Sequence, residues 1–158
     1  MTQAIPNDYP SLIPYLSIRG AAEAIEFYRH AFGAEVGVRM DAPGGRVGHA
    51  DLRVGRACFM LADPCEEYTE LASAPEHSTA IGLYLYVEDV DACFARALEA
   101  GAQQLMAVQD MFYGDRTGSL RDPWGFVWNL ASHIEDVSAD ELQRRAEQMF
   151  GRQPAGTP

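Results

Sequence analysis

Two short stretches of the sequence carry ionisable and aromatic side chains at alternate positions. His49, Asp51 and Arg53 alternate with apolar residues, and so do Tyr84 and Tyr86. Because successive side chains of a strand point to opposite faces, each set is expected to share one face of a sheet. Imidazole exchanges protons near neutral pH, so His49 is a candidate general base. The alternative is a structural role, in which His49 is a hydrogen-bond donor paired with Asp51.

A third candidate is the segment from Asp110 to Arg116, which mixes acidic, aromatic and basic residues. The Arg116 guanidinium could orient a ligand, since its fork of N–H groups matches a carboxylate or a phosphate. Alternatively, Arg116 pairs with Asp110 or Asp122 and braces the loop. The apolar and aromatic residues of this segment are expected to contact a ligand or a second subunit; they are Met111, Phe112 and Tyr113.

The elements that must position these residues occur twice in the same order. The first series is a strand over 12–18, a helix from Ala21 that ends at Gly33, and strands over 36–40, 47–54 and 57–62. The second is a strand over 81–87, a helix after Asp89 that ends at Gly101, and strands over 104–108, 119–121 and 126–131. This order predicts a duplicated βαβββ unit. The alternative is an ordinary α+β sandwich in which the repeat is a coincidence.

The expected domain organisation follows from this repeat. A single domain spans residues 11–137, with units over 11–62 and 79–133 and a linker over 63–78. A flexible N-terminus over 1–10 precedes it. Ser138 and Glu141 form a capping box, which predicts a helix over 138–150, and a disordered tail over 151–158 follows.

Composition excludes several classes of function. The net charge is −11, from 23 acidic against 12 basic residues, and such a surface repels nucleic acid. No stretch is long and apolar enough for a membrane span, and residues 1–10 show no secretion signal, so we expect a cytoplasmic protein. Cys58 and Cys93 lie in apolar runs and are expected to be buried, inert thiols.

Several segments together resemble the vicinal-oxygen-chelate superfamily, which includes glyoxalase I, extradiol dioxygenases and the bleomycin- and fosfomycin-resistance proteins. They are residues 22–28 with Phe32-Gly33-Ala34, residues 86–91, and Asp122-Pro123-Trp124-Gly125. Residues 49–52, 109–116 and 132–138 are similar to the PhnB-like branch. The resemblance implies an α+β fold, in which two tandem βαβββ units form a cupped mixed sheet. It also implies a homodimer, whose chains complete a cup together or pack side by side.

The resemblance further implies where metal ligands would lie. Motif by motif, the first-strand positions fall on Ile13 and Gly82, and the last-strand positions on Asn129 and on Met60 or Leu61. These side chains are not ligands that a catalytic divalent ion prefers. Of the histidines, only His49 lies in an expected sheet strand, and His133 falls beyond the last one. We therefore expect no metal and no cofactor.

Strand alternation assigns a concave face of aromatic and polar residues: Tyr15, His49, Asp51, Tyr84, Tyr86 and Asn129. Such a lining is typical of a small-molecule site. The leading hypothesis is therefore a metal-independent protein that binds an aromatic or amphipathic ligand, similar to the resistance proteins. The alternative is an enzyme (a lyase, isomerase or dioxygenase) that uses His49 or an unrecognised metal. A methyltransferase is disfavoured because no glycine-rich loop follows a first strand.

Overall fold

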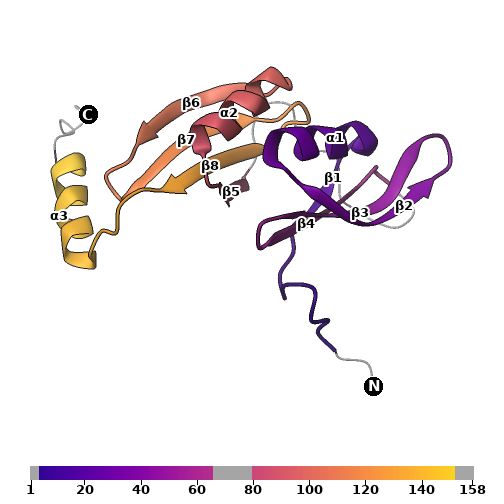
Figure 1. Ribbon diagram of the computed structural model, residues 1–158, viewed down its shortest axis with the longest axis horizontal. Coiled ribbons are helices and arrows are strands. Elements are labelled where there is room, and N and C mark those ends of the chain that lie inside the picture. The colour runs from indigo at the N-terminus through magenta and orange to yellow at the C-terminus, as the bar shows by residue number, and fades with distance from the viewer. Residues whose placement is uncertain (1–3, 66–79, 152–158) are drawn as a thin grey trace, which may run out of the picture.

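A computed structural model describes residues 4–65 and 80–151, and it contains two units of the same topology (Figure 1). The first unit comprises β1 (Tyr15–Ser17), α1 (Ala21–Phe32), β2 (Glu35–Ala42), β3 (Arg46–Val54) and β4 (Ala57–Ala62). The second comprises β5 (Gly82–Tyr86), α2 (Val90–Glu99), β6 (Gln103–Asp110), β7 (Asp115–Arg121) and β8 (Val127–His133). A last helix, α3 (Ala139–Phe150), follows. The expected linker and tail lie largely outside the described residues.

Each unit forms its own four-stranded mixed sheet, and the strand orders correspond. Sheet A has the order β1-β4-β3-β2, and sheet B has the order β5-β8-β7-β6. In both sheets the first strand is parallel to the last strand of its unit, with Tyr15 opposite Met60 in one and Tyr84 opposite Asn129 in the other. This correspondence confirms the α+β fold of two tandem βαβββ units and disfavours a coincidental repeat.

The helices begin and end where the sequence indicates. Gly33 has a φ of 68° and its N–H donates to the Arg29 carbonyl oxygen, which ends α1. Asp89 caps α2 by accepting a hydrogen bond from the Ala92 N–H at 2.9 Å. Ser138 does the same for α3, with the Glu141 N–H at 3.3 Å. No helix among the described residues is long and apolar enough to cross a membrane.

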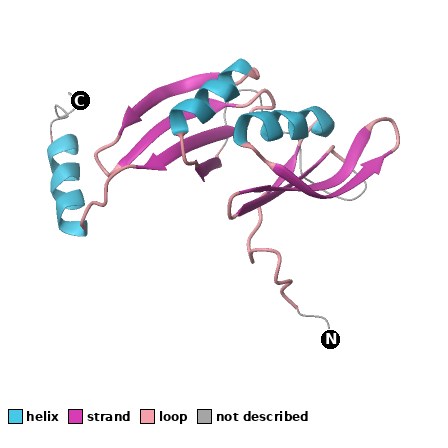
Figure 2. Ribbon diagram, in the orientation of Figure 1, coloured by secondary structure: helices cyan, strands magenta, loops and turns pink. Residues whose placement is uncertain are grey.

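The two units share one core, which lies between their helices and the helix-covered faces of both sheets. Helices α1 and α2 lie side by side (Figures 1 and 2), and the Cys93 thiol donates to the Ala31 carbonyl oxygen. Trp128 of β8 reaches across to the first unit, with its ring centroid 4.8 Å from that of Phe32 and 5.5 Å from that of Phe59. The burial of these large aromatic side chains holds the two units together.

A buried carboxylate joins two of the sequence motifs that carry the family resemblance, residues 22–28 and 122–125. The Oδ2 of Asp122 accepts hydrogen bonds from the Tyr28 hydroxyl at 2.6 Å and from the Trp128 indole at 2.9 Å. Its other oxygen accepts from the backbone N–H groups of Trp124 and Phe126 and so fixes the turn before β8. Burial raises the pKa of Asp122 even though these donors oppose it.

No helix among the described residues covers the opposite faces of the two sheets, and we call them open face A and open face B. On open face A lie Tyr15, His49, Asp51 and Met60, because Asp51 pairs with Met60, and Met60 with Tyr15. On open face B lie Tyr84, Tyr86, Asp115, Ser119, Asn129 and His133, by the register of β5, β7 and β8. The candidate site residues are therefore carried by two separate sheets.

Candidate functional site

Open face B carries a pair of exposed tyrosines on β5. The side chains of Tyr84 and Tyr86 are 48% and 58% exposed, and their ring centroids lie 5.3 Å apart with an interplanar angle of 51°. They point to the same side because they are two residues apart in a strand. Their rings form an apolar wall, and both hydroxyl groups turn toward β7.

Asp115, the first residue of β7, fixes the two tyrosines. It is only 4% exposed, and its Oδ2 accepts hydrogen bonds from the Tyr86 hydroxyl at 2.6 Å and from the Tyr84 hydroxyl at 3.4 Å. Its Oδ1 contacts Nδ1 of His133 at 2.8 Å, because the two residues are register partners. Burial raises the pKa of Asp115, but the hydrogen bonds from Tyr86 and His133 outweigh it, so the net shift is downward.

His133 is a site residue that sequence reasoning missed. It was expected beyond the last strand, whereas β8 continues to His133 and places it on open face B. Its Nε2 contacts Asp136 at 2.9 Å, and the hydrogen bonds to Asp115 and Asp136 raise the pKa of the imidazole. The expected strand ends at residue 131. Extending it by two residues places His133 on the same face as Asn129.

Open face A carries a second aromatic pair. The Tyr15 hydroxyl lies 3.0 Å from Nδ1 of His49, and their ring centroids are 5.6 Å apart. Burial raises the pKa of Tyr15, so its hydroxyl remains a proton donor at neutral pH. The sequence left open a pairing of His49 with Asp51. In the structure His49 contacts Tyr15 instead, and the described partners of Asp51 are other groups.

Asp51 lies on the expected face but is covered by the N-terminal segment. It is 1% exposed, and it accepts hydrogen bonds from the Tyr9 hydroxyl at 3.2 Å and from the Val38 N–H at 2.6 Å. Arg53 lies over the Tyr9 ring, 5.1 Å from its centroid. A Cβ at Gly37 would approach Asp51 to 2.4 Å, so the missing side chain there makes room for the carboxylate. A ligand would have to displace Tyr9 to reach Asp51.

The structure places Arg116 on the helix-covered side of sheet B, away from the tyrosine pair. Its guanidinium contacts Asp91 of α2 at 2.7 Å and Asp110 of β6 at 2.8 Å. Hydrogen bonds to these two carboxylates raise the pKa of Arg116. Of the two alternatives, this geometry matches the brace, with Asp91 in place of Asp122 as the second partner.

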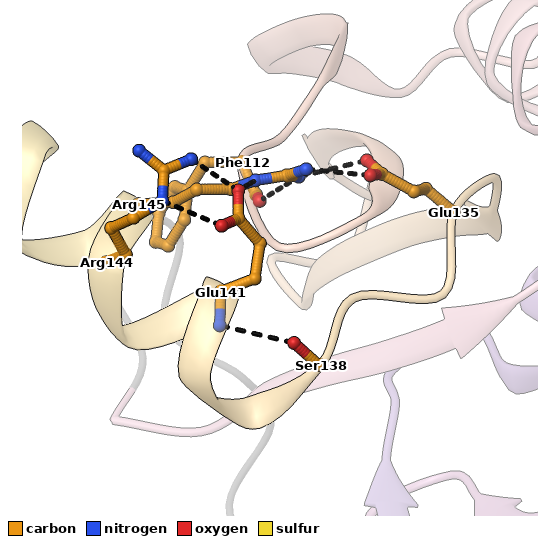
Figure 3. Close-up of polar contacts among 6 residues, drawn as sticks. All are labelled: Phe112, Glu135, Ser138, Glu141, Arg144 and Arg145. Carbon is orange, nitrogen blue, oxygen red and sulfur yellow. Dashed lines mark hydrogen bonds and ion pairs between the residues drawn. The ribbon is translucent and has the colours of Figure 1, made fainter.

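The turn between β6 and β7 packs against α3, and its Tyr113 also interacts with Tyr84 of open face B. The rings of Phe112 and Phe150 meet edge to face with centroids 6.2 Å apart. Arg145 donates to the Phe112 carbonyl oxygen at 3.1 Å and to Glu135 at 2.7 Å, while it also pairs with Glu141 (Figure 3). Whether the residues of this turn contact a ligand or a partner remains a prediction.

Comparison with known proteins identifies the family. The model of the Glyoxalase/Bleomycin resistance protein/Dioxygenase superfamily matches residues 15–130. The chain belongs to this superfamily. An uncharacterised protein of Mycobacterium tuberculosis is 40% identical over 145 residues, which cover 90% of this chain and 85% of that one.

Among solved structures of this superfold, TioX from Micromonospora sp. ML1 is similar, with 28% identity and a TM-score of 0.64, over 80% of this chain and all of TioX. The PhnB protein of Bacillus cereus has 24% identity and a TM-score of 0.61, over 78% of this chain and 99% of that chain. The second likeness concerns the fold alone. The family match confirms the superfamily that the sequence motifs indicated, and both neighbours share its fold.

The positions that correspond to metal ligands in the superfamily do not fit a metal in this chain. Met60 rather than Leu61 lies on open face A, at the place that Asn129 occupies on open face B. A Cβ at Gly82 would lie 3.4 Å from Nδ2 of Asn129, so positions 82 and 129 are neighbours as two ligands of one ion would be. Gly82 offers no donor, however, and Oδ1 of Asn129 already accepts from the Ser119 hydroxyl at 2.5 Å. Within the described ranges, no three His, Cys, Asp or Glu side chains are grouped to hold an ion.

The structure does not bring the predicted site residues to one cavity. Tyr15, His49 and Asp51 gather on open face A, whereas Tyr84, Tyr86 and Asn129 gather on open face B. Among the hydrogen bonds and ring contacts between described residues, none joins a side chain of one open face to a side chain of the other. The described contacts of this glyoxalase-superfamily chain therefore leave the candidate residues in two groups, one on each open face.

Proposed function

We propose that this protein binds a small molecule against its open faces without the help of a metal ion. The observation that carries the proposal is the combination of exposed aromatic rings with a few ordered polar groups, at the place where the superfamily's metal ligands would lie. Aromatic walls with sparse polar groups are the usual lining of small-molecule sites. Gly82 has no side chain and the Asn129 carbonyl oxygen is already hydrogen-bonded, so a metal ion would lack coordinating groups at these positions. The bound small molecule must therefore be held by the protein side chains themselves.

We further propose that a second copy of the chain completes the site. Tyr15 is 41% exposed on open face A, and the tyrosine pair is exposed on open face B. Each face offers one wall, and a small-molecule site needs most of the ligand surface enclosed. Open face A of one copy against open face B of another supplies two opposed aromatic walls. The homodimer would then contain two equivalent cups.

The metal-free proposal is tested by elemental analysis of protein purified without chelators. We expect less than about 0.1 equivalents of any divalent ion per chain after dialysis, because the ligand set is wrong for one. About one equivalent of a single divalent metal per chain would overturn the proposal. A thermal-shift screen of neutral aromatic and amphipathic compounds tests binding, since a ligand at 100 times its Kd stabilises the native state by about 2.7 kcal/mol.

The shared cup is tested by mixing two inactive variants. Tyr15→Leu disables open face A, and Tyr84→Leu disables open face B. A mixed dimer retains one intact cup if the two faces of a cup come from different chains. We expect the mixture, refolded together, to recover up to about a quarter of the wild-type sites. If the cup lies within one chain, mixing recovers none. Sedimentation that shows only monomer at micromolar concentration would count against the dimer.

The second candidate function is catalysis by His49, and the Tyr15–His49 contact favours it. In the tautomer whose Nδ1–H donates to the Tyr15 hydroxyl oxygen, 3.0 Å away, Nε2 is unprotonated and can accept a proton from a ligand in the cup. For any compound that binds and is turned over, His49→Gln should lower kcat by about 100-fold or more. Binding of the same compound should stay within about threefold. An unchanged kcat would assign His49 a structural role.

A further inference from the structure

The hydroxyl groups of the tyrosine pair of open face B contact protein side chains, although both tyrosines are exposed. Tyr84 and Tyr86 are about half exposed, yet the hydroxyl group of Tyr86 donates to Asp115 at 2.6 Å. The hydroxyl of Tyr84 lies 3.2 Å from Thr117 Oγ1 and 3.4 Å from Asp115. The polar ends of both rings are thus held by neighbouring side chains of β7. What remains for a ligand is the π surface, whose face carries partial negative charge.

The Asp115 carboxylate, which accepts from the tyrosine hydroxyl groups, increases the partial negative charge of the ring faces. A phenol that donates its proton to a carboxylate gains electron density on its oxygen, and part of that density is delocalised into the ring. The hydrogen bond to Asp115 raises the pKa of Tyr86, and burial raises that of Tyr84, so both rings remain neutral phenols at physiological pH. Electron-rich, neutral rings attract cations through their quadrupole.

The cationic side chains near the open faces already contact acceptors of the protein. Arg53 donates to the Asp8 carbonyl oxygen at 2.8 Å, and Arg121 donates to the Gly125 carbonyl oxygen at 3.3 Å. His133 lies between two carboxylates. An anionic ligand would have to compete with these acceptors, and it would approach a chain with a net charge of −11.

We infer that the tyrosine pair selects flat aromatic ligands that carry a positive charge. The inference rests on the proposed function, because it names the ligand class of the same site. The rings of Tyr84 and Tyr86 stack on the ligand and their π surface attracts its charge, while the Asp115–His133 pair holds the rings in place. A planar cation therefore binds more tightly than an anion of the same shape.

Two acridines with the same three-ring frame test the inference. 9-Aminoacridinium is a cation at neutral pH, and acridine-9-carboxylate is an anion, so their comparison isolates charge. Fluorescence titration of the full chain should give a Kd at least about tenfold lower for the cation, which corresponds to about 1.4 kcal/mol. Equal or tighter binding of the anion, or no binding of either probe, would overturn the inference. The proposed function is judged separately by the screen of neutral compounds, so it can survive that result.

Substitutions at the pair locate the effect. Tyr86→Leu should weaken binding of 9-aminoacridinium about tenfold, whereas Tyr86→Trp should restore it, because tryptophan is the strongest cation–π partner. Phe150→Leu removes an exposed aromatic ring on α3 and should leave the Kd unchanged. If Tyr86→Leu folds with an unchanged circular dichroism spectrum and binds the cation as tightly as the wild type, the tyrosine pair is not the recognition surface.

Discussion

Replacing Asp115 with Asn removes a buried charge on which three side chains converge. Asn keeps the size of the side chain but can accept hydrogen bonds through only one oxygen. At least one of the contacts from Tyr86 at 2.6 Å and from His133 at 2.8 Å is therefore lost or becomes neutral. A hydrogen bond to a charged group contributes about 1.5–3 kcal/mol, against about 1 kcal/mol for a neutral one. We expect Asp115→Asn to lower the free energy of unfolding by about 2 kcal/mol.

For a domain of this size, that loss corresponds to a fall in Tm of about 4–8 °C. Urea unfolding at pH 6, followed by circular dichroism, measures the free energy directly. Asp136→Asn is the matched control, because Asp136 contacts the other nitrogen of His133 but is fully exposed, and it should change the free energy by less than about 0.5 kcal/mol. If both variants unfold at the wild-type urea concentration, Asp115 does not organise open face B.

The Asp115–His133 pair makes the free energy of unfolding depend on pH in two directions. The pKa of Asp115 is lowered, so its contribution is present above the unfolded-state pKa and is lost as the pH falls through the folded-state pKa. The pKa of His133 is raised, so its contribution is present below about 6.5 and is lost as the pH rises through the folded-state pKa. Wild-type stability should therefore decline above about pH 6.5, and Asp115→Asn should flatten that decline. An unchanged slope in the variant would refute the coupling.

Four further variants, in three comparisons, test the fold. Gly114→Ala should destabilise the protein far more than Gly33→Ala. Both glycines have a positive φ, but only a Cβ at position 114 would meet backbone, at 2.2 Å from the Glu135 carbonyl oxygen. Thermal melts of the two variants measure the difference. Tyr28→Phe should cost about 1–3 kcal/mol in urea unfolding, because it removes a donor from the buried carboxylate of Asp122, and a loss below about 0.5 kcal/mol would contradict the buried bond. Ser138→Ala should weaken α3 by about 1 kcal/mol, seen as faster amide exchange in that helix alone.

The fold could be predicted from the sequence because the local signals for helix ends and strand faces agree with the tertiary packing. Gly33 marks a helix end through its positive φ, and Asp89 and Ser138 mark helix starts through side-chain caps, all of which are local interactions. Alternation also placed Tyr84 and Tyr86 on one face correctly. These features depend on neighbours in the chain, and a single sequence records such neighbours directly.

The candidate site was harder to predict because its contacts join distant residues. The residues around Asp51 in the sequence do not predict that Tyr9 covers it, and those around Arg116 do not predict its ion pair with Asp91. The strand end at His133 depends on pairing with β7, which local composition does not reveal. The separation of the two open faces depends on how the helices of the two units pack, and strand alternation carries no information on that.

The contact between Tyr9 and Asp51 has a practical consequence for the preparation of this protein. The sequence predicts a flexible N-terminus over residues 1–10, so a shortened version would naturally begin at residue 11. Such a version would leave a buried carboxylate without one of its donors and would uncover Arg53. Any affinity tag fused to the N-terminus extends from a segment that lies on open face A, so ligand screens should use a tag that is cleaved before measurement.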